Sequence, residues 1–320
     1  MMNKSFLACA LALCATLSAV PVHAEQTVRL IVAFPPGGPV DLVGRVLAER
    51  LGKELGRQII VENKAGANGN IGAAFVAKAP ADGSVLFLTS VGAIAISPAL
   101  YKELPYNPKE DFAPVSLVVN NATAFVVNPA NPAKDAADFV QRSKGGAQSV
   151  AIGSSGVGSI PNLTLEMFSD ASHANVLHVP YKGAAPVIND VMGNQVAGFF
   201  GDVPGLIGHI QGGKLKVLGI AAPTRHPLLP QVPTLAEQGI AGVESNNWYG
   251  LLAPAATPPQ TVAKLNQAVR NALDDASTRQ RLQAFGAEPA PSTPEAFATL
   301  IQKDREKWSS LIEREQIKPE

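Results

Sequence analysis

The chain of 320 residues is 46% hydrophobic and 16% charged, and its 26 basic residues balance its 26 acidic residues. This composition is typical of a globular protein, and the length is sufficient for two α/β lobes. The formal net charge is 0, and no basic stripe or block of like charge is present. We therefore expect no nucleic-acid partner.

Residues 1–24 have the pattern of a secretory signal peptide. Lys4 supplies the positive start, residues 6–20 form an apolar core, and Val22-His23-Ala24 is a cleavage site of small residues. We expect cleavage after Ala24. No later stretch is long and apolar enough to cross a membrane, so the pattern indicates a protein exported to a bacterial periplasm.

A strand, a glycine-rich turn and a helix are expected over residues 28–55. Residues 28–34 form a short β-branched apolar run that stops at Pro35-Pro36-Gly37-Gly38. A helical stripe follows, with Gly56 as its C-terminal stop; it comprises Val43, Val46, Leu47, Leu51 and Leu55. Such a turn leaves backbone N–H groups free at the positive end of a helix, which favours an anion site.

The same pattern returns in the second half of the chain. Residues 149–163 contain a short strand, a Gly/Ser turn and the start of a helix that continues through Leu165 and Phe168. Two such turns, one in each half, indicate a ligand held between two lobes.

The order of elements predicts parallel strands. Strands at 58–62 and 85–89, with a helix through Ile71 and Val76 between them, complete a β-α-β-α-β unit. Ligands lie beyond the carboxyl ends of such strands, which brings the first turn, the loop 63–70 and Ser90 to one edge. The proline-rich residues 97–114 are expected to form a connection over the surface.

The second half is expected to repeat the β-α-β pattern. The expected strands are residues 149–153, 176–179, 196–200, 215–221 and the return strand 247–253. Capping boxes are expected at Thr234–Glu237 and Thr257–Gln260, and the last helix at Thr293-Pro294. We expect one lobe from residues 25–122 with 250–320 and a second lobe from residues 123–249.

No motif for catalysis, cofactor or metal binding is complete. A dinucleotide fingerprint beginning at Gly156 fails because position 161 is proline, and both cysteines, Cys9 and Cys14, lie in the signal peptide. The histidines lack metal-ligand spacing. We expect no enzyme, no catalytic residue, no metal and no cofactor.

Several polar residues allow two interpretations. Asp41 either braces the turn at the start of the helix or accepts from an amine or hydroxyl of a ligand. Tyr181 and Lys182 either reach into a cleft or lie on a surface turn. Phe34 is either a core residue or an apolar wall of the site.

The sequence resembles the Bug-type extracytoplasmic solute receptors of tripartite tricarboxylate transporters, over essentially the whole chain after residue 24. The matching stretches are AFPPGGPVDLVGR at 33–45, ENKAGANGNIGA at 62–73, IGSSGVGSIPNL at 152–163, VPYKGAAP at 179–186, FFGDVP at 199–204, residues 212–239 and NWYGLLAPAATP at 247–258. The resemblance implies the fold of type II periplasmic binding proteins, with two lobes of mostly parallel sheets and flanking helices around a cleft. One departure is Asn162, where many relatives carry histidine.

The resemblance also implies a binding site. Two loops, one from each lobe, would grip a ligand carboxylate, largely through backbone N–H groups and bridging water. The implied ligand-binding residues are Phe34, Gly37, Gly38 and Asp41 in the first loop, Ser154, Ser155, Gly156, Gly158 and Ser159 in the second, and Asn68, Ser90, Tyr181 and Asp202 along the cleft.

Our hypothesis from the sequence is a monomeric periplasmic receptor for a small carboxylate. The candidate ligands are di- or tricarboxylates, acidic amino acids and aromatic acids. Hinge closure would present the loaded receptor to the permease subunits of a membrane transporter. The alternatives are a receptor that signals to a sensor kinase and an exported enzyme that acts on the captured acid.

Overall fold

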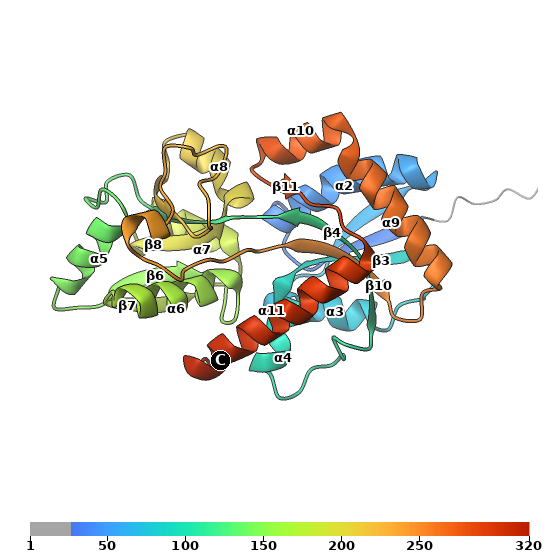
Figure 1. Ribbon diagram of the computed structural model, residues 1–320, viewed down its shortest axis with the longest axis horizontal. Coiled ribbons are helices and arrows are strands. Elements are labelled where there is room, and N and C mark those ends of the chain that lie inside the picture. Colours follow the sequence, from blue (N-terminus) through green and yellow to red (C-terminus); the bar gives the residue numbers. More distant parts are fainter. Residues whose placement is uncertain (1–26, 320) are drawn as a thin grey trace, which may run out of the picture.

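Two α/β lobes lie side by side and are joined by two crossings of the chain (Figure 1). The computed structural model describes residues 27–319, so the expected signal peptide and its cleavage site lie outside the described residues. Each lobe contains one β-sheet with helices on both faces.

The first lobe has a sheet of six strands in the order β11-β4-β10-β3-β1-β2. The strands are β1 (Val28–Val32), β2 (Ile59–Asn63), β3 (Val85–Ser90), β4 (Phe112–Asn120), β10 (Tyr249–Pro254) and β11 (Glu288–Pro289). β1 runs parallel to β2 and β3, as the order of elements predicts. β10 runs antiparallel to β3 and β4 because it returns from the other lobe.

Helices cover both faces of this sheet. One face carries α2 (Pro39–Leu55), α9 (Pro259–Asp274) and α10 (Ala276–Ala284); the other carries η1 (Ala67–Gly69), α3 (Asn70–Val76), η2 (Gly92–Ile96), α4 (Ser97–Leu100) and α11 (Pro294–Arg314). The predicted stripe of α2 is buried, with Val43, Leu47 and Leu51 fully inaccessible. Burial of each such side chain contributes roughly 1.5–3 kcal/mol, which fixes the start of α2 relative to the sheet.

The second lobe has a sheet of five strands in the order β7-β6-β8-β5-β9. The strands are β5 (Thr123–Val127), β6 (Val150–Ser154), β7 (Val176–Pro180), β8 (Gly198–Asp202) and β9 (Lys216–Ile220). One face packs on α5 (Ala136–Lys144), α6 (Ile160–Ser172) and the short η3 (Ala236–Gln238); the other packs on α7 (Ala184–Met192) and α8 (Val203–Gln211). β7-β6-β8 are parallel, whereas the crossing strand β5 is antiparallel to both neighbours.

The two crossings lie against each other. The outward crossing joins β4 to β5, and the return crossing reaches β10 at Tyr249. Asn121 Nδ2 donates to the Asn247 carbonyl at 2.8 Å, and the Asn247 N–H donates to the Asn121 carbonyl at 3.1 Å. An antiparallel bridge between Ala122 and Asn246 continues this pairing. Two short adjacent segments of this kind can act as a hinge between lobes.

Three expectations about local structure need correction. Residues 97–114 do not all run over the surface, because α4 follows the buried turn η2 and its Leu100 is itself buried. The return strand begins at Tyr249 rather than at Asn247. The capping box at Thr257 does not form: the N-cap of α9 is Pro258, and the buried Thr257 hydroxyl has no partner among the described residues.

Two other caps form as predicted. The Thr234 N–H donates to Glu237 Oε2 at 2.7 Å, and the Glu237 N–H donates to the Thr234 hydroxyl oxygen at 3.1 Å. Thr293 caps α11 by accepting from the Ala296 N–H. Among residues 27–319, no helix combines the length and the apolar character needed to cross a bilayer.

Candidate functional site: a cleft between the lobes

The candidate site is a cleft between the lobes, which has two compartments. We call the cavity of ≈ 260 Å³ between α2, α7 and α8 the inner compartment. The outer compartment, of ≈ 540 Å³, lies along the loop of residues 65–69 and the second turn. Both are lined by Phe34, Pro35, Ser155, Lys182 and Gly183, so one cleft runs between the two lobes.

Asp41 holds the first turn in place. Its Oδ2 accepts from the Gly37 N–H at 2.9 Å and from Arg45 Nε at 2.8 Å, and its Oδ1 accepts from Asn63 Nδ2 at 2.9 Å. The residue is 1% exposed. Burial alone would raise the pKa of this carboxyl, but the bonds from Arg45, Gly37 and Asn63 outweigh it and hold the pKa below its usual value. Asp41 lines neither compartment, in accord with its interpretation as a brace.

The second turn is held by its own side chains in the same way. Ser154 Oγ accepts from the Gly156 N–H at 3.1 Å and lies 2.6 Å from His178 Nε2. Ser159 caps α6, and its hydroxyl donates to the Gly156 carbonyl at 2.6 Å. Asn162 Oδ1 accepts from the Gly158 N–H at 2.9 Å, so the residue that replaces histidine holds this loop.

These bonds correct the expectation that the glycine N–H groups are free. Gly37, Gly156 and Gly158 donate to the side chains just described, and the Gly38 N–H donates to the Pro35 carbonyl at 3.2 Å. The glycines therefore shape the turns. Within residues 27–319, no protein acceptor takes the N–H of Val40 or Ser155, two residues that line the inner compartment. The N–H groups that remain free therefore belong to residues close to the predicted glycines.

Four helices begin at the wall of the inner compartment. α2 and α7 contribute Val40 and Ala185 to the lining, and α6 and α8 contribute Pro161 and Gly205. Each helix brings a partial positive charge and N–H groups without an intrahelical acceptor. Lys182, which is exposed, is the single cationic side chain among the described residues that line this compartment. The four helix dipoles therefore contribute positive potential at this compartment.

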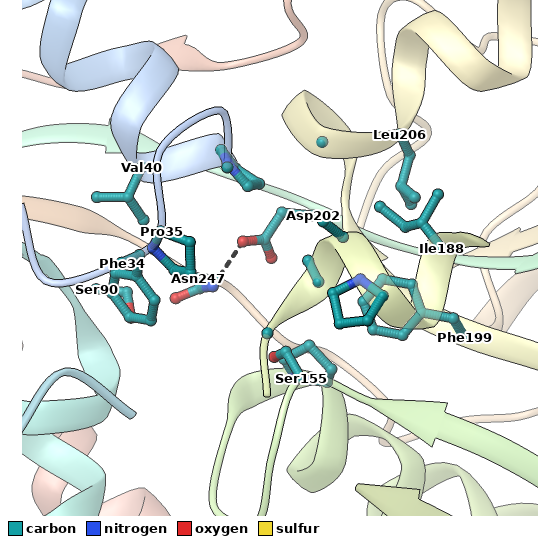
Figure 2. Close-up of a pocket in the computed structure, with 18 of the residues that line it drawn as sticks. Phe34, Pro35, Val40, Ser90, Ser155, Ile188, Phe199, Asp202, Leu206 and Asn247 are labelled. Carbon is teal, nitrogen blue, oxygen red and sulfur yellow. Dashed lines mark hydrogen bonds between the residues drawn. The ribbon is translucent and has the colours of Figure 1, made fainter. Parts of the chain in front are cut away.

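The wall of the inner compartment is largely apolar. Figure 2 shows side chains from both lobes around a central polar pair, Asp202 and Asn247. The apolar lining includes Phe34, Val40, Ile188, Phe199 and Leu206.

Asp202, Asn247 and Tyr249 form the polar part of this wall. Asp202 Oδ2 accepts from Asn247 Nδ2 at 2.7 Å and from the Tyr249 hydroxyl at 2.6 Å. Burial raises the pKa of Asp202 to about 6, against the lowering effect of these two bonds. Burial also raises the pKa of Tyr249 well above its usual value, so the phenol stays protonated and donates. Oδ1 of Asp202 and Oδ1 of Asn247 are buried without a partner in the described chain.

The structure separates the sequence-predicted residues into three groups. Phe34, Gly38, Ser90, Ser155 and Asp202 line the inner compartment, while Asn68, Gly156 and Tyr181 join Phe34 and Ser155 along the outer one. Gly37, Asp41, Ser154, Gly158 and Ser159 line neither and support the two turns from behind.

Two of the cleft residues already have protein partners. The Tyr181 hydroxyl donates to Asp190 Oδ2 at 2.6 Å, so it is not the free donor that the sequence suggested. Asn68 Nδ2 donates to the Gly158 carbonyl at 2.8 Å, and this bond joins the two lobes. Lys182 remains at the boundary of the two compartments.

Sequence reasoning did not assign Asn247 to the site. The sequence predicts a return strand for the stretch that contains it and offers Tyr249 of that stretch as a wall for an aromatic ligand. The polar side chain of Asn247 at the start of an apolar run is a usable signal for the site. The N-termini of α7 and α8 were also not recognised as part of the wall. Their signals were Gly183 and the Asp202-Val203-Pro204 sequence, which are typical of helix starts.

The sequence profile of the tripartite tricarboxylate transporter family receptor (TctC) matches residues 43–317. Among solved structures, the periplasmic binding protein BugD is 32% identical, with a TM-score of 0.86, over 92% of this chain and 99% of that one. Rpa4515 of R. palustris, solved with adipate, is 30% identical, with a TM-score of 0.88, over 92% and 98%. MatC of Rhodopseudomonas palustris, solved with bound malate, is 32% identical, with a TM-score of 0.83, over 89% and 98%.

The three solved structures match 89–92% of this chain, so the similarity extends over both lobes. The expected two-lobed binding-protein fold and the resemblance are confirmed. The protein therefore belongs to the receptor family of the tripartite tricarboxylate transporters.

Proposed function

We propose that this protein is a periplasmic receptor that captures a small carboxylate in the inner compartment and closes its lobes around it. The observation that carries the proposal is the meeting of four helix N-termini, from both lobes, at one apolar cavity of ≈ 260 Å³. Main-chain donors and helix dipoles favour an anion, and these donors do not themselves titrate near neutral pH. The cavity size suits a small acid.

The related structures support the ligand class. One neighbour was solved with adipate and another with malate, both small carboxylates. Contacts between the lobes support closure, since Pro35 and Pro39 of the first lobe lie against Gly183 and Gly205 of the second. A carboxylate held between the lobes would stabilise this closed arrangement relative to an open one.

The remaining parts of the proposal concern delivery. The leader would be removed after Ala24, and a monomer would pass the solute unchanged to the permease subunits of a tripartite transporter. The family supports the transporter partner. A receptor of this kind needs no catalytic group, and we assign none.

The first experiment measures binding of a panel of acids. Thermal shift and calorimetry on ligand-stripped protein would include adipate, malate, succinate, citrate, aspartate, glutamate and benzoate, with glucose and putrescine as controls. At least one acid is expected to raise Tm in a concentration-dependent way. A response confined to the sugar or the amine would contradict the proposal.

A matched pair of variants locates the site. Ala185→Glu adds a negative charge in the first turn of α7 at the inner compartment, and Ala276→Glu adds the same charge in the first turn of α10, away from the cleft. Acidic residues are tolerated at both helix starts, so both variants should fold. Affinity for the acid is expected to fall at least tenfold in Ala185→Glu and to stay within about twofold in Ala276→Glu, because only the first repels the bound carboxylate.

A further inference from the structure

The polar part of the inner compartment has more hydrogen-bond acceptors than donors. Asp202 Oδ2 takes both available protein donors, Asn247 Nδ2 and the Tyr249 hydroxyl. The other oxygen of Asp202 and the side-chain oxygen of Asn247 are buried and have no donor in residues 27–319. Figure 2 shows the bond between the two side chains, with the second oxygen of each directed away from it.

Unpaired buried acceptors of this kind destabilise the closed, empty protein. A buried acceptor without a donor costs free energy, and the cost is larger when the acceptor is charged. Asn247 is 7% exposed, and no ion pair to Asp202 is present in the described chain. Lys182, the cationic residue at the cleft, is exposed and lies at the boundary with the outer compartment. The missing donor therefore has to come from what occupies the cavity.

We propose that the solute carries, besides its carboxylate, a donor group that faces this pair: a hydroxyl that donates to Asp202 Oδ1, or an ammonium that donates to both Asp202 Oδ1 and Asn247 Oδ1. This inference rests on the proposed carboxylate receptor and makes its ligand class narrower: an amino or hydroxy acid rather than a plain carboxylic acid. The carboxylate binds near the starts of α2 and α7, and the donor group faces Asp202.

The same pair of residues selects against a wrong orientation. An ionised carboxylate placed against Asp202 would bring two negative charges together in a largely apolar cavity, which is strongly unfavourable. A solute with a carboxylate at one end and a donor at the other satisfies both parts of the wall. Asp202 thus determines both the orientation of the solute and its chemical class.

The experiment compares acids that share a carbon skeleton and differ in one group. Calorimetry on ligand-stripped wild-type protein would measure succinate, malate and aspartate as one series, and propionate, lactate and alanine as a second, with both enantiomers of each chiral acid. In at least one series, the acid with a hydroxyl or ammonium group is expected to bind tenfold or more tightly than its donor-free analogue. Equal affinities within both series would overturn the inference and would leave the carboxylate receptor intact.

The variant Asp202→Asn tests the assignment to this residue. Its amide oxygen can still accept from Tyr249 and Asn247, but an NH₂ group then faces the solute in place of an oxygen. The preference is expected to reverse: the variant should bind succinate at least tenfold more tightly than aspartate. Asp274→Asn is the matched control, because Asp274 is exposed on α9 and lies away from the cleft. It is expected to keep the wild-type preference.

The outcomes separate the two proposals. An unchanged preference in a folded Asp202→Asn protein would overturn the role of Asp202, and circular dichroism would establish that the variant is folded. If that variant did not fold, the two wild-type series would still decide the inference. Failure of every carboxylate to bind, with or without a donor group, would instead overturn the proposed receptor function.

Discussion

A single carboxyl group, that of Asp202, is buried in the wall of the cleft and accepts two hydrogen bonds at one of its oxygens. Burial raises its pKa to about 6 from an ordinary value of 3.8. The folded protein therefore holds this proton more tightly than the unfolded chain between about pH 4 and pH 6. Because the folded state binds more protons in that interval, this group makes the stability fall as the pH rises through it. Above pH 6 the full cost is present, at most about 3 kcal/mol.

The variant Asp202→Asn is predicted to be more stable than the wild type when both are free of ligand. The amide does not ionise, so the difference in the free energy of unfolding should be about 1–3 kcal/mol at pH 7.5 and should vanish toward pH 4. Urea denaturation of both proteins at several pH values measures this difference. An advantage of the variant that does not change with pH would show that ionisation of Asp202 is not its cause.

The role of Asp202 could be predicted from the sequence only in part. The family resemblance implies that the residue itself lines the cleft. Its donors, Asn247 and Tyr249, lie 45 and 47 residues away along the chain, and only the return of β10 to the first sheet brings them to it. No local pattern encodes that pairing, so the unpaired oxygens could not be anticipated.

At the scale of an element, the start of α2 combines predictable and unpredictable features. The apolar stripe and the terminal Gly56, with φ of 61°, follow from helix periodicity and from the preference of glycine for the left-handed region. The bonds at the N-terminal end of the helix could not be predicted in this way. The helix has no side-chain cap at Gly38, and Asp41 instead bonds backward to Gly37 and sideways to Asn63.

The variant Asp41→Ala is predicted to destabilise the protein by about 1–3 kcal/mol, because it removes the acceptor for the turn and for Asn63. Arg45→Ala is the matched comparison. It removes the partly exposed ion-pair partner and keeps the other two bonds, so it should cost no more than about 1 kcal/mol. Chemical denaturation of both variants measures these costs. Equal costs would show that the ion pair, and not the bracing of the turn, is the main contribution of Asp41.

The glycine-rich turns illustrate why a motif alone does not define a binding group. Their sequences predicted free N–H groups, and the fold does place both turns at the cleft. The donors of Gly156 and Gly158 are nevertheless used by Ser154 and Asn162, which lie within four residues of them. A short polar side chain next to a glycine turn competes with a ligand for the N–H groups of the turn. Sequence alone does not show which of the two accepts them.

At the scale of the whole molecule, the cleft and the hinge share a residue. The main chain of Asn247 pairs with Asn121 in the crossings, and its side chain bonds to Asp202 in the cleft wall. The lobes also meet away from the hinge, through Asn68 and Gly158 and through an ion pair of Arg314 with Asp170 at 3.7 Å. In Figure 1, α11 extends from the first lobe toward α6 of the second, where this ion pair forms.

The two-lobed architecture was predictable because each half has a clear β-α-β order, and the return strand has a clear apolar run. The antiparallel direction of β5 and β10 was not predicted. Their direction depends on which lobe the chain comes from, and the strand pattern itself carries no such information. The contacts that close the cleft could not be predicted either, because they join residues far apart in sequence.

Closure itself can be tested at Gly158. A Cβ atom at this position would overlap Leu100 Cδ1 of the other lobe, so Gly158→Ala should oppose the closed arrangement. Overpacking of this kind costs about 1–3 kcal/mol, which corresponds to a loss of roughly tenfold or more in affinity for a carboxylate. Small-angle scattering should also show a smaller ligand-induced compaction than in the wild type.

Gly213→Ala provides the control, because it separates closure from backbone strain. Gly158 and Gly213 have φ of 71° and 66°, so alanine is strained to a similar degree at both. A Cβ at Gly213 meets no atom within 4 Å, and this residue lies in the turn after α8, away from the lobe contacts. Both variants should therefore lose similar thermal stability without ligand, while only Gly158→Ala loses affinity. A comparable loss of affinity in Gly213→Ala would assign the effect to strain within the second lobe and would contradict the role of lobe contact in binding.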